Sequence, residues 1–251
     1  MKFAPTLLAS ISALAFTLSA SAGQTISVEA GPAYGGDNPY QSQGGGEFTA
    51  FASTGIPAGY ASDATLTLNG QTGFETFCIL PTVDIGFGNT YSFQAGPNVL
   101  VPTSGDSAAG ANSVALSNGT AWLYAQFATG QLNGYDYADT GNNRINTASE
   151  LQQALWFFQG ETYEPTNDPF VSDALAEFGG SLTLAQSAET PYEFGTDALN
   201  IYTTNANGSP DTLQQGMLVY GTPDAASTAL LLGGGLLVLV AARKRLGLQA
   251  I

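Results

Sequence analysis

The chain contains a single cysteine, Cys78, and no histidine. A cysteine thiolate is a strong nucleophile, so Cys78 is the side chain with the clearest capacity for covalent chemistry. Without histidine the chain can build neither a Ser-His-Asp or Cys-His catalytic site nor a His-ligated zinc site. Hydrolysis by two carboxylates stays open in principle, but no spacing singles out a pair among the 20 acidic residues. We therefore expect a protein that is not an enzyme and holds no cofactor.

Two segments carry a more specific pattern. Residues 74–80 are Phe-Glu-Thr-Phe-Cys-Ile-Leu, an apolar strand-forming run, and residues 150–156 are Glu-Leu-Gln-Gln-Ala-Leu-Trp, with helical spacing. Together they resemble the thioester domains of bacterial surface adhesins. In that family an aromatic or leucine residue precedes the cysteine, and a helix with the pattern Gln-x-Ala-apolar-Trp supplies its partner. Phe77-Cys78-Ile79 matches the first half and Gln152–Trp156 the second, and the resemblance spans about residues 74–160.

The resemblance implies an internal thioester between Cys78 and Gln152. The thiolate attacks the glutamine amide and ammonia leaves, a step that a fixed contact between the two groups makes intramolecular. Burial beside Phe77 and Trp156 would exclude water and slow hydrolysis. The bond would then react with amines and attach the protein covalently to an amine-bearing surface or matrix partner. Gln153 is a second candidate, but it points about 100° away around the helix, so only one glutamine can meet the thiol.

A second interpretation stays open beside this one. Cys78 then is a small buried hydrophobe, residues 151–156 form an ordinary amphipathic helix, and the protein is a non-covalent structural or extracellular-matrix component. The lysine content bears on the choice, because the only lysines are Lys2 and Lys244, near the two ends. A lysine-free body would avoid cross-linking to itself through an amine-reactive group. Acidic exported proteins are also often poor in lysine, so composition alone explains the absence equally well.

The C-terminal end has a three-part layout. Thr222-Pro223-Asp224 is followed by about eighteen small and apolar residues, roughly one bilayer span, and then by Arg243-Lys244-Arg245. This segment, 222–251, resembles the PEP-CTERM sorting signals, in the variant with Val-Pro-Asp, with threonine in place of valine. The resemblance implies an exosortase-type processing enzyme as a partner and a membrane anchor before processing. An ordinary C-terminal membrane anchor is the alternative.

The N-terminal end predicts export. Lys2 precedes an apolar stretch, residues 7–18, and then Ala20-Ser21-Ala22, which has the small residues of a signal-peptidase site. Residues 1–22 are therefore expected to be a signal peptide, and residues 23–221 the exported body. We expect the mature protein at the cell surface or outside the cell, with a transient anchor in the inner membrane.

Charge excludes one large class of partner. The formal net charge is −15, and within residues 23–221 the only cation is Arg144. Such a chain offers no basic patch for DNA, RNA or anionic lipid, so nucleic acid is not an expected partner. Oxygen ligands in the run Asp136–Asn143 could hold calcium, but an acidic turn is the preferred interpretation, and no metal site is predicted.

The coarse pattern of elements is strands, then helices, then strands. This predicts an α+β fold, a strand-rich body with a central cluster of two or three helices. A helix is expected from Thr120 to Gly130, another from a Thr147–Glu150 capping box to Gly160, and a third from an Asp168 cap to Phe178. Strands are expected at Thr25–Glu29, Glu47–Ala52, Thr65–Leu68, Glu75–Leu80, Thr90–Gln94, Ser181–Ala185, Leu199–Thr203 and Met217–Tyr220.

Overall fold

The structure is a computed structural model that describes residues 25–29, 41–42, 45–54, 66–68, 71–102, 112–138, 142–161, 165–191, 193–206 and 210–221. The predicted signal peptide and the whole sorting segment, with Thr222, Pro223, Asp224, Arg243, Lys244 and Arg245, lie outside these residues. Within the part that is described, no helix is both long enough and apolar enough to cross a bilayer.

Eleven strands and four helices follow one another along the described chain. The first strands are β1 (Thr25–Glu29), β2 (Gln41–Ser42), β3 (Gly45–Gly46), β4 (Phe48–Thr54), β5 (Leu66–Leu68), β6 (Gln71–Thr76), β7 (Thr90–Gly96), β8 (Asn98–Val101) and β9 (Asn112–Ala115). The helices are α1 (Asn118–Ala128), α2 (Asn142–Gln159), α3 (Pro169–Glu177) and α4 (Leu182–Ala185), and the chain then returns to β10 (Thr196–Thr204) and β11 (Pro210–Tyr220). The predicted mixture of strands and helices, rich in strands, is confirmed.

Seven strands form one antiparallel sheet in the order β11-β10-β7-β1-β4-β6-β5. Directly after β6 the chain crosses to the opposite edge strand, β11, where Cys78 bridges Met217. The Ile79 N–H donates to the Gly216 carbonyl at 2.9 Å, and the Leu218 N–H donates to the Phe77 carbonyl at 3.2 Å. The sheet is therefore closed on itself at this end, and Cys78 lies on the seam.

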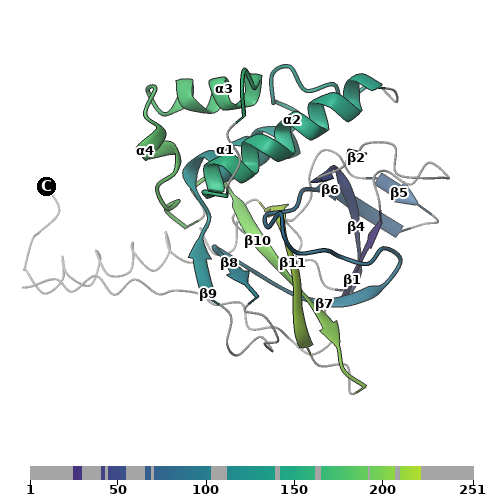
Figure 1. Cartoon of the computed structure of the whole chain (residues 1–251). Helices are drawn as coiled ribbons and strands as arrows, with labels where there is room; N and C mark the ends of the chain where they lie inside the picture. Colours follow the sequence, from purple (N-terminus) through teal and green to yellow (C-terminus); the bar gives the residue numbers. More distant parts are fainter. Residues whose placement is uncertain are drawn as a thin grey trace, which may run out of the picture.

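The curved sheet separates two hydrophobic clusters. Figure 1 shows the four helices gathered on one side of the molecule, with the strands of the large sheet beneath them. One cluster, here the helix-side cluster, packs α1, α2 and α3 against the sheet. The other, here the sheet-interior cluster, is enclosed by the strands. Neighbouring residues alternate between them, as the twofold period of a strand requires: Phe77 and Ile79 belong to the helix-side cluster, and Cys78 to the sheet-interior cluster.

Local sequence explains three of the helix ends. The Asp168 side chain accepts hydrogen bonds from the Phe170 and Val171 N–H groups, and Pro169 occupies the first helical position, so α3 begins where it was predicted. Ser117 caps α1 by accepting from the Thr120 N–H at 3.2 Å. Gly160, with a φ of +86°, follows the last residue of α2, because glycine tolerates this conformation without strain.

Three local predictions are wrong. The strand expected at Glu75–Leu80 lies earlier, as β6 at Gln71–Thr76, and Cys78 forms only an isolated bridge. Thr147 does not cap α2, which begins five residues earlier at Asn142; its hydroxyl instead lies within the helix and donates to the Arg144 carbonyl at 3.2 Å. The first turns of α2 are held by tertiary contacts of Arg144, which the local pattern does not contain. The predicted strand Ser181–Ala185 is the short helix α4, because Ser181 accepts from the Leu184 N–H and so caps a turn.

Candidate functional site

Cys78 is enclosed by the fold. Its side chain lies in the sheet-interior cluster, and the residue is 5% exposed. Burial raises the pKa of the Cys78 thiol to about 12, although a hydrogen bond from the Gln215 side chain opposes the rise. At neutral pH the group is therefore a protonated thiol, and any reaction through its thiolate is slow.

Gln152 meets Cys78 through its side-chain amide. The residue is 1% exposed and projects from α2 onto the backbone of Cys78. Its Nε2 donates to the Cys78 carbonyl at 2.7 Å, and its Oε1 accepts from the Cys78 N–H at 3.1 Å. The Gly46 N–H also points to Oε1, at 3.5 Å. The Gln152 amide therefore pairs with the N–H and the C=O of Cys78 as the backbone of a neighbouring strand would. Its carbonyl oxygen lies between two backbone N–H groups.

Gln153, the other glutamine that the sequence left open, faces elsewhere. It is half-buried, and its Nε2 donates to the Ser149 hydroxyl at 3.3 Å, one turn earlier on α2. The helical rotation of about 100° per residue accounts for this difference. The structure thus brings Gln152, and not Gln153, to Cys78.

Trp156 and the hairpin of β2 and β3 cover the amide. Trp156, one turn after Gln152 on α2, belongs to the same cluster as Cys78 and is 9% exposed. Gly45 of β3 packs so closely that a Cβ built there would lie 2.8 Å from Gln152 Cγ and 3.0 Å from Trp156 Cη2. A larger residue at position 45 cannot fit unless α2 moves away. Gly45 also has a φ of +124°, a conformation that side chains rarely adopt.

Phe77, the second residue predicted to line the pocket, lies on the other face of the strand segment. It is fully buried in the helix-side cluster, where its ring packs edge-on against Phe127 with centroids 4.9 Å apart. Phe77 thus fixes the segment that carries Cys78 from the helix side, whereas Trp156 lies on the side of the thiol.

A glutamine that the sequence did not suggest, Gln215 of β11, also reaches Cys78. It is 2% exposed, its Nε2 donates to the Leu80 carbonyl at 2.6 Å, and its side chain hydrogen-bonds to the Cys78 thiol. Its Oε1 has no hydrogen-bond partner among the described residues. No local pattern could reveal Gln215, because its approach depends on β11 pairing with the segment after β6.

A charged network joins α2, the helix that carries Gln152, to β6, the strand that ends just before Cys78, and to Glu47. Arg144, near the start of α2, contacts Glu47 at 2.5 Å and Glu75 of β6 at 2.7 Å. The Tyr135 hydroxyl donates to Glu47 at 2.6 Å, and Arg144 also donates to the Tyr137 carbonyl at 2.7 Å. Burial, and then the neighbouring Glu47 carboxylate, raise the pKa of Glu75 to about 10, so Glu75 is protonated at neutral pH. The only cation of the body is therefore a structural group in a buried ion pair.

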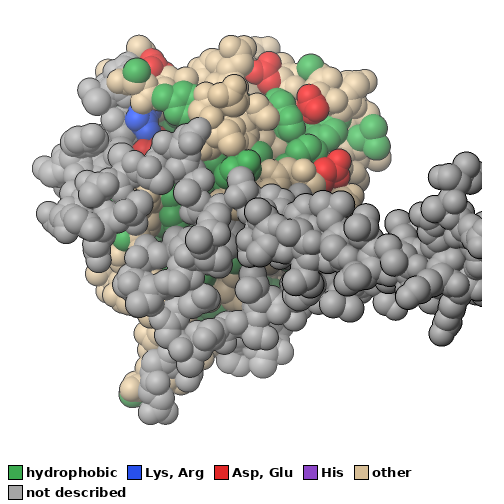
Figure 2. All heavy atoms as spheres, turned by 180° about the vertical axis from the view of Figure 1, so that it is seen from behind, with side chains coloured by type: hydrophobic (Ala, Val, Ile, Leu, Met, Phe, Trp, Pro, Cys, Tyr) green, Lys and Arg blue, Asp and Glu red, His purple; other side chains and the backbone are tan. Residues whose placement is uncertain are grey.

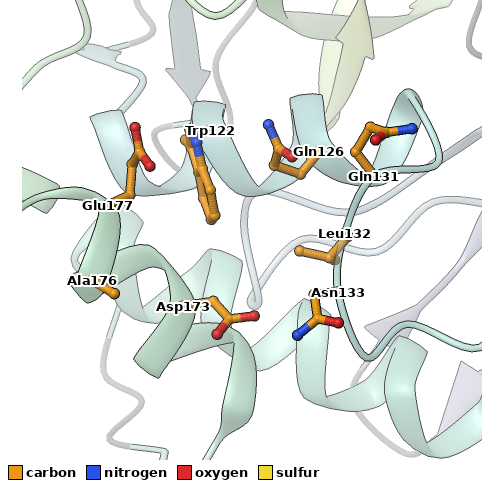
Figure 3. Close-up of a pocket in the computed structure, with 8 residues that line it drawn as sticks. All are labelled: Trp122, Gln126, Gln131, Leu132, Asn133, Asp173, Ala176 and Glu177. Atoms are coloured by element: carbon orange, nitrogen blue, oxygen red, sulfur yellow. The ribbon is translucent and has the colours of Figure 1, made fainter.

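A surface hollow of about 490 Å³ lies away from these groups. As Figure 3 shows, the Trp122 ring projects from α1 with the Glu177 side chain beside it, and Asp173 lies across the hollow. Neither Cys78 nor Gln152 lines it. On the face in Figure 2, acidic side chains are scattered over the described surface, and Lys or Arg side-chain atoms are visible in one place. Among the described residues no cluster of three or more acidic or cysteine side chains is placed to hold a metal; residues 139–141 of the acidic turn lie outside them.

No protein-family model, no curated protein and no solved structure matches the chain.

Proposed function

We propose that the chain is an exported cell-surface protein that attaches covalently to amine-bearing partners through a thioester between Cys78 and Gln152. The observation that supports this most directly is the position of the Gln152 amide. Its Oε1 accepts from the backbone N–H groups of Cys78 and Gly46, at 3.1 and 3.5 Å. Two such donors are the arrangement that stabilises the negative oxygen formed when a nucleophile adds to a carbonyl.

The chemistry balances without an added reagent. The Cys78 sulfur attacks the side-chain carbonyl carbon of Gln152, and the oxyanion forms between the two N–H groups. The carbon–nitrogen bond then breaks, and the thiol proton leaves with the amide nitrogen as ammonia. With a thiol pKa of about 12 the step is slow, but it needs to occur only once in the life of each molecule. Burial of both groups limits hydrolysis of the product.

The partner class follows from the electrophile and the surface. A thioester reacts with unprotonated primary amines, and lysine side chains are their commonest source on proteins. The body carries one cation, Arg144, which is engaged with Glu47 and Glu75, so its surface field is negative and attracts basic partners. Export and exosortase-type sorting, which we infer from the two ends of the sequence, would present this surface outside the cell.

Intact mass tests the proposal. The exported protein should be lighter than its sequence by one ammonia, and the Cys78→Ala and Gln152→Ala variants should have full mass. Gln153→Ala is the matched control and should still lose ammonia. Methylamine should restore the mass of the wild type with the gain of one methyl group. A wild-type mass equal to the sequence, with a thiol that titrates after unfolding, would refute the thioester.

One observation favours a non-covalent structural protein as the second candidate. The Gln152 amide bonds to the N–H and the C=O of Cys78 and so joins α2 to the seam of the sheet. A purely structural brace would need the same contacts. In this case the protein, sorted in the same way, binds its surroundings without a covalent bond, and the mass measurement above separates the two candidates.

A further inference from the structure

Gln215 approaches Cys78 from the strand across the seam. Cys78 lies opposite Met217 in an antiparallel bridge, and Gln215 lies two residues before Met217 along β11. The contact of its Nε2 with the Leu80 carbonyl, at 2.6 Å, follows from the same register. Gln215 is thus held beside the thiol by backbone pairing rather than by a flexible loop.

The orientation of the Gln215 amide is fixed by its surroundings. The Leu80 carbonyl can only accept a hydrogen bond, so the Gln215 nitrogen must face it. The second N–H of the same nitrogen is then the group that can donate to the Cys78 sulfur. This leaves Oε1 as a buried acceptor with no partner among the described residues. A buried acceptor of this kind is uncommon in a native fold and calls for an explanation.

We propose that Gln215 assists the reaction of the Cys78–Gln152 thioester with a primary amine: its Nε2–H donates to the sulfur as it leaves, and its Oε1 accepts a hydrogen bond from the attacking amine. The inference rests on the proposed function. It gives a role to each end of the Gln215 amide. The Nε2–H stabilises the negative charge that the leaving sulfur gains, and Oε1 accepts from the amine nitrogen, which becomes a stronger hydrogen-bond donor as it attacks.

The step conserves atoms and charge. The amine nitrogen bonds to the carbonyl carbon of Gln152, the carbon–sulfur bond breaks, and the proton lost by the amine ends on the sulfur. The products are a substituted amide on Gln152 and a free thiol on Cys78. Gln215 itself gains and loses no proton, so it lowers the barrier only through its two hydrogen bonds.

Methylamine and intact mass measure the rate. The probe is methylamine added to the exported protein, and the conversion of thioester to methylamide is followed over time. Gln215→Met keeps the length of the side chain but removes both polar ends. We expect aminolysis to be about ten- to a hundred-fold slower, because two hydrogen bonds are lost and each is worth up to about ten-fold. Gln214→Met is the matched control: Gln214 is the neighbouring residue on β11, is half-buried and donates to the Leu213 carbonyl at 3.2 Å, so its substitution should leave the rate unchanged.

A second variant separates chemistry from structure through pH. In Gln215→Glu the introduced carboxyl can donate to sulfur only when protonated, and its anion repels the leaving thiolate. The ratio of its rate to that of the wild type should therefore fall as pH rises, while the ionisation of methylamine cancels in the ratio. A purely structural role predicts a ratio independent of pH.

The possible results are distinct. A wild type of full mass overturns the thioester and this inference together. A thioester in the wild type, with Gln215→Met reacting at the wild-type rate or Gln215→Glu giving a ratio without pH dependence, overturns the role of Gln215 alone. If Gln215→Met does not fold, the pH dependence of Gln215→Glu decides by itself.

Discussion

Two buried polar contacts join the strand segment around Cys78 to helix α2, and they are built from opposite kinds of group. At Cys78 a neutral amide, Gln152, bonds to backbone groups. Two turns earlier on α2, Arg144 bonds to the carboxyl groups of Glu47 and Glu75. Breaking an ion pair leaves a charge in a poorly solvated place, whereas losing a neutral amide leaves only unsatisfied dipoles. The charged contact of Arg144 should therefore contribute more to the stability of this junction. The neutral contact of Gln152 is the one that we propose for the thioester chemistry.

The largest expected effect comes from removing the cation. Arg144→Met leaves the Glu47 carboxylate buried without its charge partner, and we expect unfolding free energy to fall by about 3–5 kcal/mol. Denaturant unfolding measures this. Adding Glu47→Gln to Arg144→Met removes the isolated charge and should recover part of the loss. If the double variant is no more stable than Arg144→Met, the unpaired charge of Glu47 is not the cause of the lost stability.

The next effect tests the neutral contact. Gln152→Leu removes the partner of the Cys78 N–H and C=O, and we expect a loss of about 2–3 kcal/mol, because each buried group left unsatisfied costs about 1–3 kcal/mol. Gln153→Leu, on the half-buried side of the same helix, should change unfolding free energy by less than about 0.5 kcal/mol. Equal losses for the two variants would contradict the placement of Gln152 at the seam.

A smaller effect is expected from the hairpin over the amide. Gly45→Ala adds a Cβ 2.8 Å from Gln152 Cγ at a φ of +124°, so both contact and backbone strain oppose it. Gly134→Ala is a matched control, with a φ of +78° and open space around its Cβ. We expect backbone strain of about 1 kcal/mol in both variants, and a further loss in Gly45→Ala. Only Gly45→Ala should slow the loss of ammonia, as followed by intact mass.

The remaining prediction concerns a slope with pH rather than a loss at one pH. The raised pKa of Glu75, about 10, means that the folded protein holds a proton that the unfolded chain releases above its ordinary pKa near 4.5. Stability from this group is therefore full in acid and is lost as pH rises from about 4.5 towards 10, by at most about 1.4 kcal/mol per pH unit. Glu75→Gln imitates the protonated state and should flatten unfolding free energy against pH. A slope unchanged in Glu75→Gln would mean that other acids, such as Glu189 with its pKa raised by burial to about 7, account for it.

Much of the helical region could be predicted because its signals are local. Asp168 before Pro169, and Gly160 after the last turn of α2, act within a few residues of the backbone that they cap. The apolar stripe of α2, with Leu151, Leu155 and Phe158, is buried as its spacing indicated. The start of α2 was missed because its first turns depend on Arg144 reaching Glu47, a residue distant in sequence.

The sequence by itself determined which groups are scarce: one thiol, no histidine, one cation in the body, and two adjacent glutamines on a helix. Helical rotation also required that only one of those glutamines could meet the thiol. The tertiary structure decided that it is Gln152, and it added Gln215 from a strand that local patterns do not connect with Cys78. The physical reason is sequence separation. Caps and stripes act between near neighbours, whereas the contacts of Gln152 and Gln215 with the Cys78 segment join residues 74 and 135 positions apart and exist only once the sheet has closed.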